Sequence, residues 1–191
     1  MSSLNPVEAG TENYTAGQTR TLTVRFDNWK WRKATISGSD ENAKLYRIEC
    51  HMRKPQIILQ SLLSNSASTE ASGDASFHTL SSRIDIRLHD QRIELISRGS
   101  LKNVYTYVSH AFDGAKMTWQ SRSIGRDFNI VCLDEKAIPV AQISLGSWSL
   151  TKAGTIELTG ARVMNQGPEM DEIVLTGIAI MQQRLTTYAM Y

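Results

Sequence analysis

Short segments in which apolar and polar residues alternate recur along most of this chain. Residues 82–88 show the pattern most clearly, because Ile84, Ile86 and Leu88 alternate with charged side chains. A period of two residues is typical of a strand that buries one face. The same pattern predicts strands at 21–26, 34–36, 44–51, 55–63, 92–96, 104–108, 116–121, 128–133, 137–144 and 155–159, with a short stub at 77–78.

Turn signals separate these segments. His89-Asp90, Asp113-Gly114 and the run 134–136 each fall between two predicted strands. About a dozen short strands at this spacing indicate an antiparallel barrel or sandwich. Strands do not alternate with helices anywhere in the sequence, so a parallel sheet is not indicated. The fold class is therefore all-β, with one exception near the C-terminus.

That exception is an apolar segment within a helix predicted at about 169–184. From 173 to 181 only Thr176 is clearly polar, and at 100° per residue the apolar side chains point in every direction. A helix that is apolar all round must be buried all round. Its nine residues reach about 14 Å, roughly half the thickness of a bilayer core, so the protein itself must enclose it. Gly177 inside the helix suggests that another element packs closely there.

The predicted helix fits inside the predicted barrel. A closed sheet of about twelve strands has a lumen too wide for its own side chains to fill, and the helix is the obvious filling. We therefore predict one domain over residues 20–191, preceded by a flexible arm at 1–19 and interrupted by a flexible loop at 64–76, where Ser, Ala, Asn, Thr and Gly dominate.

Composition narrows the class of protein. The chain has 191 residues, 41% hydrophobic and 21% charged, with a net charge of +2. This describes an ordinary globular domain, and the charge is too small to indicate nucleic acid. The first residues contain neither a basic start nor an apolar run, so a cytoplasmic or nuclear location is expected. Cys50 and Cys132 lie in strand-like runs and are interpreted as reduced core residues, or as one disulfide if their strands are neighbours.

The sequence offers little for catalysis. The four histidines are scattered, and His51 directly follows Cys50, so the two side chains would face opposite sides of a strand. No nucleophile elbow, phosphate-binding glycine loop or metal-ligand spacing is present. We expect no enzyme activity, no metal and no cofactor.

Basic clusters are the best candidates for a binding site. In the run Asn28-Trp-Lys-Trp-Arg-Lys33, an extended chain would place the tryptophans on one face and the cations Lys30 and Arg32 on the other, with Lys33 at the end. Such a segment suits an anionic membrane surface, although core tryptophans beside solvated cations would give the same pattern. Further candidate ligands for an anion or lipid head group are Arg53, Lys54, Arg122 and Arg126. Arg83 and Arg87, with Asp85 between them, indicate an ordinary ion-paired surface instead.

Several of these segments together resemble a known family. They are Lys-Leu-Tyr-Arg-Ile-Glu at 44–49, Met-Thr-Trp-Gln at 117–120, the strand at 128–133 with its Asp-Glu-Lys turn and Val140-Ala141, Gly-Thr-Ile-Glu-Leu at 154–158, and Met-Asp-Glu-Ile-Val-Leu at 170–175 running to Gln183-Arg184. In order and spacing they resemble the tubby C-terminal-like fold of LURP-one-related proteins and phospholipid scramblases, and most of all its small fungal members. The likeness covers roughly residues 21–184.

The resemblance implies a twelve-stranded barrel around a hydrophobic C-terminal helix. It also implies a non-enzymatic cytoplasmic module that recognises anionic phospholipid or phosphoinositide head groups peripherally at a membrane, because tubby holds a phosphoinositide on basic residues of its barrel wall. Tubby's basic pocket does not align residue by residue with this chain, and the cysteine-rich and calcium-binding features of scramblases are absent. The alternative is a protein-interaction or nuclear regulatory module without lipid binding.

Overall fold

The computed structural model describes residues 18–27, 32–39, 43–62, 71–78, 81–98, 104–121, 128–145 and 153–188. These contain twelve strands, one short 3-10 helix and one α-helix. In chain order the elements are β1 (Thr19–Phe26), β2 (Lys33–Ser37), β3 (Lys44–Cys50), β4 (Ile57–Ser61), β5 (Gly73–Phe77), β6 (Ile84–Leu88), β7 (Gln91–Arg98), β8 (Val104–Val108), β9 (Lys116–Ser121), β10 (Phe128–Leu133), β11 (Pro139–Leu145), β12 (Ala153–Thr159), η1 (Ala161–Val163) and α1 (Pro168–Tyr188).

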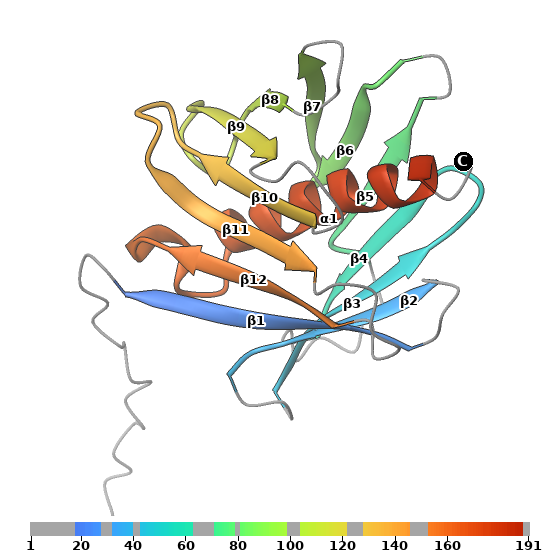
Figure 1. The fold of residues 1–191 in the computed structure, drawn as a ribbon, viewed down its shortest axis with the longest axis horizontal. Coiled ribbons are helices and arrows are strands. Elements are labelled where there is room, and N and C mark those ends of the chain that lie inside the picture. Colours follow the sequence, from blue (N-terminus) through green and yellow to red (C-terminus); the bar gives the residue numbers. More distant parts are fainter. Residues whose placement is uncertain are drawn as a thin grey trace, which may run out of the picture.

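The strands form one closed antiparallel barrel (Figure 1). Each strand pairs with its neighbours in sequence, and β1 closes the ring by pairing with β12, where Leu22 lies opposite Ile156 and Val24 opposite Gly154. Hydrophobic positions alternate as predicted, so that one side of every strand faces the interior. The predicted fold class is confirmed, including the number of strands found in the described residues.

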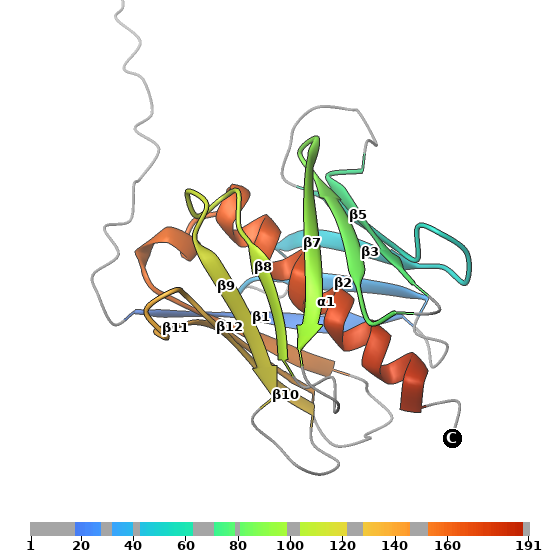
Figure 2. The ribbon, with the colours of Figure 1, turned by 90° about the horizontal axis from the view of Figure 1, so that it is seen from above.

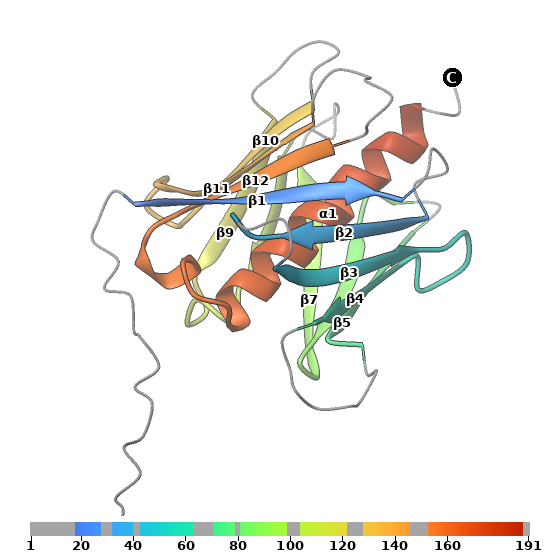
Figure 3. The same ribbon diagram turned by 90° about the horizontal axis from the view of Figure 1, so that it is seen from below.

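Helix α1 runs through the middle of this barrel, as Figures 2 and 3 show from two sides. Its six largest apolar side chains between 173 and 181 are at most 2% exposed (Ile173, Val174, Leu175, Ile178, Ile180 and Met181). Burying each of them contributes about 1.5 to 3 kcal/mol before entropic costs. Among the residues that the structure describes, no helix combines the length and the apolarity needed to cross a membrane.

Close packing explains the glycine inside α1. A Cβ added at Gly177 would lie 2.3 Å from Cδ1 of Ile143 on β11 and 2.9 Å from the ring of Trp119 on β9. No real Cβ tolerates such distances. The predicted close approach at Gly177 is therefore confirmed, and the strand side chains that cause it are identified.

Two buried carboxylates tie the beginning of α1 to the barrel. Asp171 accepts a hydrogen bond of 2.6 Å from the hydroxyl of Tyr46 on β3 and lies 2.8 Å from Nε2 of His89 in the β6–β7 turn. Oε2 of Glu172 accepts hydrogen bonds from the backbone amides of His110 and Ala111 in the β8–β9 turn, at 3.2 and 3.1 Å. Carboxylates near a helix N-terminus also interact favourably with its dipole. This end of the barrel is therefore closed by polar contacts.

One prediction about the loops is wrong. The segment predicted as a flexible loop at 64–76 contains most of β5, whose inward-facing positions are the small residues Gly73 and Ala75. A Cβ at Gly73 would lie 2.7 Å from both a side-chain carbon of Leu175 and the carbonyl oxygen of Arg87. Small side chains are needed here because α1 passes close to β5, and the resulting composition resembles that of a loop.

Other boundaries shift by a few residues. The first strand begins at Thr19, inside the predicted arm, because Thr19 pairs with Thr159 of β12. The last helix extends from Pro168 to Tyr188, beyond the predicted 169–184. Residues 1–17, and residues 64–70 of the predicted loop, lie outside the described residues. Cys50 and Cys132 are both free thiols on strands that are not neighbours in the barrel, which removes the disulfide alternative.

Candidate anion-binding face

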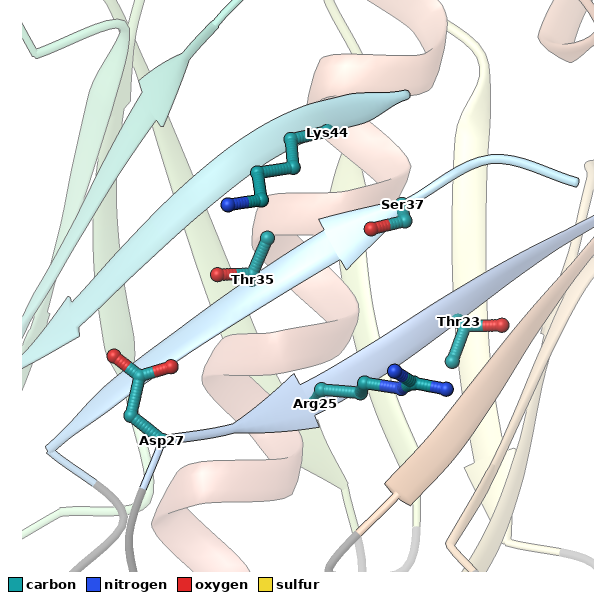
Figure 4. A pocket seen from close by; sticks show the side chains of 6 residues that line it. All are labelled: Thr23, Arg25, Asp27, Thr35, Ser37 and Lys44. Atoms are coloured by element: carbon teal, nitrogen blue, oxygen red, sulfur yellow. The ribbon is translucent and has the colours of Figure 1, made fainter. Parts of the chain in front are cut away.

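A hollow lies on the outer wall of the barrel across β1, β2 and β3 (Figure 4). Its volume is about 190 Å³, and the side chains that line it are Thr23, Arg25, Asp27, Thr35, Ser37 and Lys44. Two cations and three hydroxyl groups therefore surround one open space, together with a single carboxylate. Such a set can hold an anion that accepts several hydrogen bonds, of which a phosphate group is the commonest example.

Strand register determines which side chains reach the hollow. Leu22 and Val24 of β1 point into the barrel and are fully buried, so Thr23 and Arg25 point outward. Thr35 of β2 lies opposite Arg25 on one side and opposite Arg47 of β3 on the other. Because neighbouring strands are about 4.8 Å apart, the Cα atoms of the two arginines lie on either side of Thr35 and about 10 Å from each other.

Lys44 and Asp27 occupy opposite ends of the hollow. Figure 4 shows the Thr35 hydroxyl between the ammonium group of Lys44 and the Asp27 carboxylate, whereas the Arg25 side chain is directed away from them, toward Thr23. The aspartate opposes an anion near it, so the favourable position for an anion is on the Lys44 side of the hollow. Lys44 is exposed to solvent.

A second group of cations lies at the adjoining end of the barrel. The backbone amide of Cys50 donates a 2.7 Å hydrogen bond to the carbonyl of Arg32, which places the start of β2 beside the turn at 51–56. Arg53 and Lys54 are exposed in that turn. Lys33 follows Arg32 and forms an ion pair of 3.3 Å with Glu49 of β3. The predicted candidates Arg32, Lys33, Arg53 and Lys54 are thus brought together by the fold.

The hollow and this end of the barrel form one continuous surface, which we name the cation face. In the described residues it contains seven cations and two carboxylates, Asp27 and Glu49, whereas the whole chain has a net charge of only +2. Positive charge is therefore concentrated on one wall of the molecule. The seven cations are Arg25, Arg32, Lys33, Lys44, Arg47, Arg53 and Lys54.

The sequence identified only part of this surface. Arg25, Lys44 and Arg47 were not among the predicted candidates, because they come from separate strands and only the register places them together. Their outward position could have been inferred from the alternation in each strand. Of the remaining candidates, Lys30, Arg122 and Arg126 lie outside the described residues, as do Trp29 and Trp31.

The wall on the other side of the barrel is different. On β5 to β7, Arg83 contacts Asp85 at 2.9 Å and Glu94 at 2.7 Å. Arg87 forms a 2.7 Å ion pair with Asp74. The prediction of an ordinary ion-paired surface is confirmed there, and this wall serves as an internal reference for the cation face.

The polar cluster at the beginning of α1 is the other candidate for chemistry. Burial, followed by the charge of Asp171, raises the pKa of Tyr46 far above its ordinary value, so the phenol stays protonated. It donates to Asp171, which also contacts His89, and both acceptor oxygens of the carboxylate are thereby used. This arrangement holds the helix in place. No three His, Cys, Asp or Glu side chains in the described ranges are placed to share a metal ion.

Comparison with models of known protein families, with curated proteins and with solved structures finds no match for this chain.

Proposed function

We propose that this protein is a non-enzymatic module that binds anionic phospholipid head groups through its cation face. The observation that carries the proposal is the concentration of seven cations on the wall formed by β1, β2, β3 and the turn at 51–56, against two carboxylates. Cells offer a surface of complementary charge in the cytoplasmic leaflet of their membranes. We therefore infer that the cation face binds such a membrane peripherally, from the cytoplasmic side.

The hollow adds a place for one phosphate group. The hydroxyls of Thr23, Thr35 and Ser37 can donate to phosphate oxygens, while Arg25 and Lys44 supply positive charge on two sides. Guanidinium and ammonium groups bind phosphate by charge-assisted hydrogen bonds, which are stronger than neutral ones. The resemblance to the tubby-like fold favours the same ligand class. A phosphoinositide head group, with more than one phosphate, would use the hollow and the neighbouring cations together.

Vesicle co-sedimentation tests this function. Each basic residue near an anionic surface contributes about 1 kcal/mol, so Lys44→Glu with Arg47→Glu should weaken binding to phosphoinositide-containing vesicles by about 30-fold or more. Binding should also fall steeply between 50 and 300 mM salt, because exposed charges are screened. Vesicles of neutral lipid alone should bind little protein.

A matched control variant reverses two charges elsewhere. Arg92 and Arg98 are exposed on β7, across the barrel from the cation face, and Arg92→Glu with Arg98→Glu changes the net charge by the same amount. This control should retain most of the binding. Equal binding to neutral and anionic vesicles, or equal losses in both double variants, would remove the proposal.

A protein-interaction module is the second candidate, and one observation favours it. Ile96 of β7 and Val108 of β8 are 50% and 61% exposed on neighbouring strands of the outer wall. Ile96 lies opposite Thr106 of β8. Thr106 is two residues before Val108, so Thr106 and Val108 lie on the same face of β8. If this patch binds a protein, affinity purification should recover a stoichiometric partner that is lost on Ile96→Lys with Val108→Lys and is unaffected by the Lys44→Glu, Arg47→Glu variant.

A further inference from the structure

The turn between β3 and β4 exposes a methionine. Met52 is 90% exposed, whereas the other methionines that the structure describes, Met117, Met164, Met170 and Met181, are completely buried. Exposed apolar side chains are common singly, so exposure alone means little. Met52 is of interest because it lies in an anchored turn at one end of the barrel and is followed by two cations.

The backbone of this turn is held on both sides. The amide of His51 donates a 2.7 Å hydrogen bond to the carbonyl of Gln56, and the amide of Gln56 donates a 2.9 Å bond to Ala75 of β5. The turn is therefore anchored to the barrel wall at its base. Met52 directly follows this anchored base, and its side chain is exposed.

Cations adjoin the methionine on the side of the cation face. Arg53 and Lys54 follow it directly, and both are exposed. Arg32 belongs to the neighbouring segment, joined through its carbonyl to the amide of Cys50. Figures 1 and 3 show the turn projecting from the end of the barrel at which α1 finishes, opposite the end closed by Asp171 and Glu172. An exposed apolar side chain beside cations is the pattern that an anionic lipid interface favours.

Resting on the proposed function, we propose that Met52 inserts among the lipid head groups while Arg53 and Lys54 contact their phosphates. The partner is an anionic bilayer surface, because the charges around the tip complement it and a thioether side chain packs adaptably against acyl chains. Insertion at this tip orients the barrel, with the end at which α1 finishes toward the bilayer.

Site-specific labelling tests the insertion. An environment-sensitive fluorophore is attached to Met52→Cys in a Cys50→Ala background, and to Glu94→Cys in the same background as the reference. Cys132 is completely buried, so it does not react in the folded protein. With vesicles of phosphatidylcholine, phosphatidylserine and a phosphoinositide, the label at 52 should shift to shorter wavelength and be quenched by lipids that carry a shallow spin label. The label on β7 should show neither effect.

Affinity provides an independent measurement. Full burial of a methionine corresponds to about a 10- to 150-fold change in an equilibrium constant, so partial insertion predicts that Met52→Ala weakens vesicle binding by about five- to tenfold. Met52→Leu should retain the binding of the unaltered protein, and Met52→Asp should lose more than Met52→Ala. Each variant should unfold in urea like the unaltered protein, because the side chain is exposed.

The outcomes separate this inference from the function on which it rests. If the unaltered protein does not bind anionic vesicles, both the proposed function and the proposed insertion are refuted. If binding is salt-dependent and sensitive to Lys44→Glu with Arg47→Glu, the function stands. In that case an unquenched label at 52 together with unchanged affinity of Met52→Ala overturns the insertion alone. Quenching at 52 with a five- to tenfold loss supports it.

Discussion

Replacing Gly177 by alanine tests whether α1 is enclosed as tightly as the structure shows. In an open helix this change would stabilise the protein by about 1 kcal/mol, because alanine is the better helix former. In the barrel the added Cβ would lie 2.3 Å from Cδ1 of Ile143 and 2.9 and 3.0 Å from two ring carbons of Trp119. The Ile143 methyl is the end of a flexible side chain and can move. The Trp119 ring is held by its hydrogen bond of 3.0 Å to Thr176.

Two opposing effects determine the magnitude. Overpacking a core costs about 1 to 3 kcal/mol, and the fixed tryptophan ring places this site in the upper half of that range. Subtracting the gain in helix propensity leaves a net loss of about 1 to 2 kcal/mol. The melting temperature of a domain of this size should then fall by about 2 to 8 °C.

Urea unfolding with an unchanged m-value is the appropriate assay, and two further variants control it. Ile143→Val removes the atom nearest to the new Cβ, so the double variant should lose about 1 kcal/mol less than the sum of the single changes. Gly38→Ala should change stability by less than about 0.5 kcal/mol, because its Cβ would meet only side-chain atoms at 3.8 Å. A Gly177→Ala protein as stable as the original, or more stable, would show that the contact is absent.

Three other outcomes are expected. Ile178→Asp should abolish soluble folding, since it buries an unpaired carboxylate, and a soluble variant that melts cooperatively would contradict the enclosure of that position. Tyr46→Phe should cost about 1.5 to 3 kcal/mol in urea unfolding by removing the donor to buried Asp171, and an unchanged midpoint would contradict this. Burial raises the pKa of Cys50 to about 11, and burial together with the charge of Asp171 raises the pKa of Tyr46 further. The folded state therefore keeps protons that the unfolded state releases above about pH 9. The free energy of unfolding should consequently fall as the pH rises from 9 to 11. Urea midpoints that stay constant over that interval would refute the assignment.

The alternation of side chains allowed most of the fold to be predicted. Each strand with large inward residues was recognisable, and the all-round apolarity of 173–181 indicated a helix inside the barrel. Strand β5 could not be recognised, because Gly73 and Ala75 are small to make room for Leu175, a requirement that arises only when α1 is in place. Local composition follows tertiary packing there rather than propensity.

The candidate site was less predictable for a related reason. Arg32 with Lys33, and Arg53 with Lys54, are neighbours in sequence and were visible as clusters. Arg25 and Arg47 are brought to either side of Thr35 by register alone, and register depends on the pairing of three strands. The contacts of Asp171 with Tyr46 and His89 likewise join segments far apart in the chain. Such contacts depend on the completed fold, which local patterns cannot supply.

The order of elements along the chain has a consequence for biosynthesis. The twelve strands that the structure describes leave the ribosome before α1, the element that their apolar faces must surround. The sheet also cannot shut until β12 is available to β1, so native closure is delayed until nearly the whole domain has been translated. Until then the nascent chain displays strands without their core, and it should depend on chaperones that shield such surfaces.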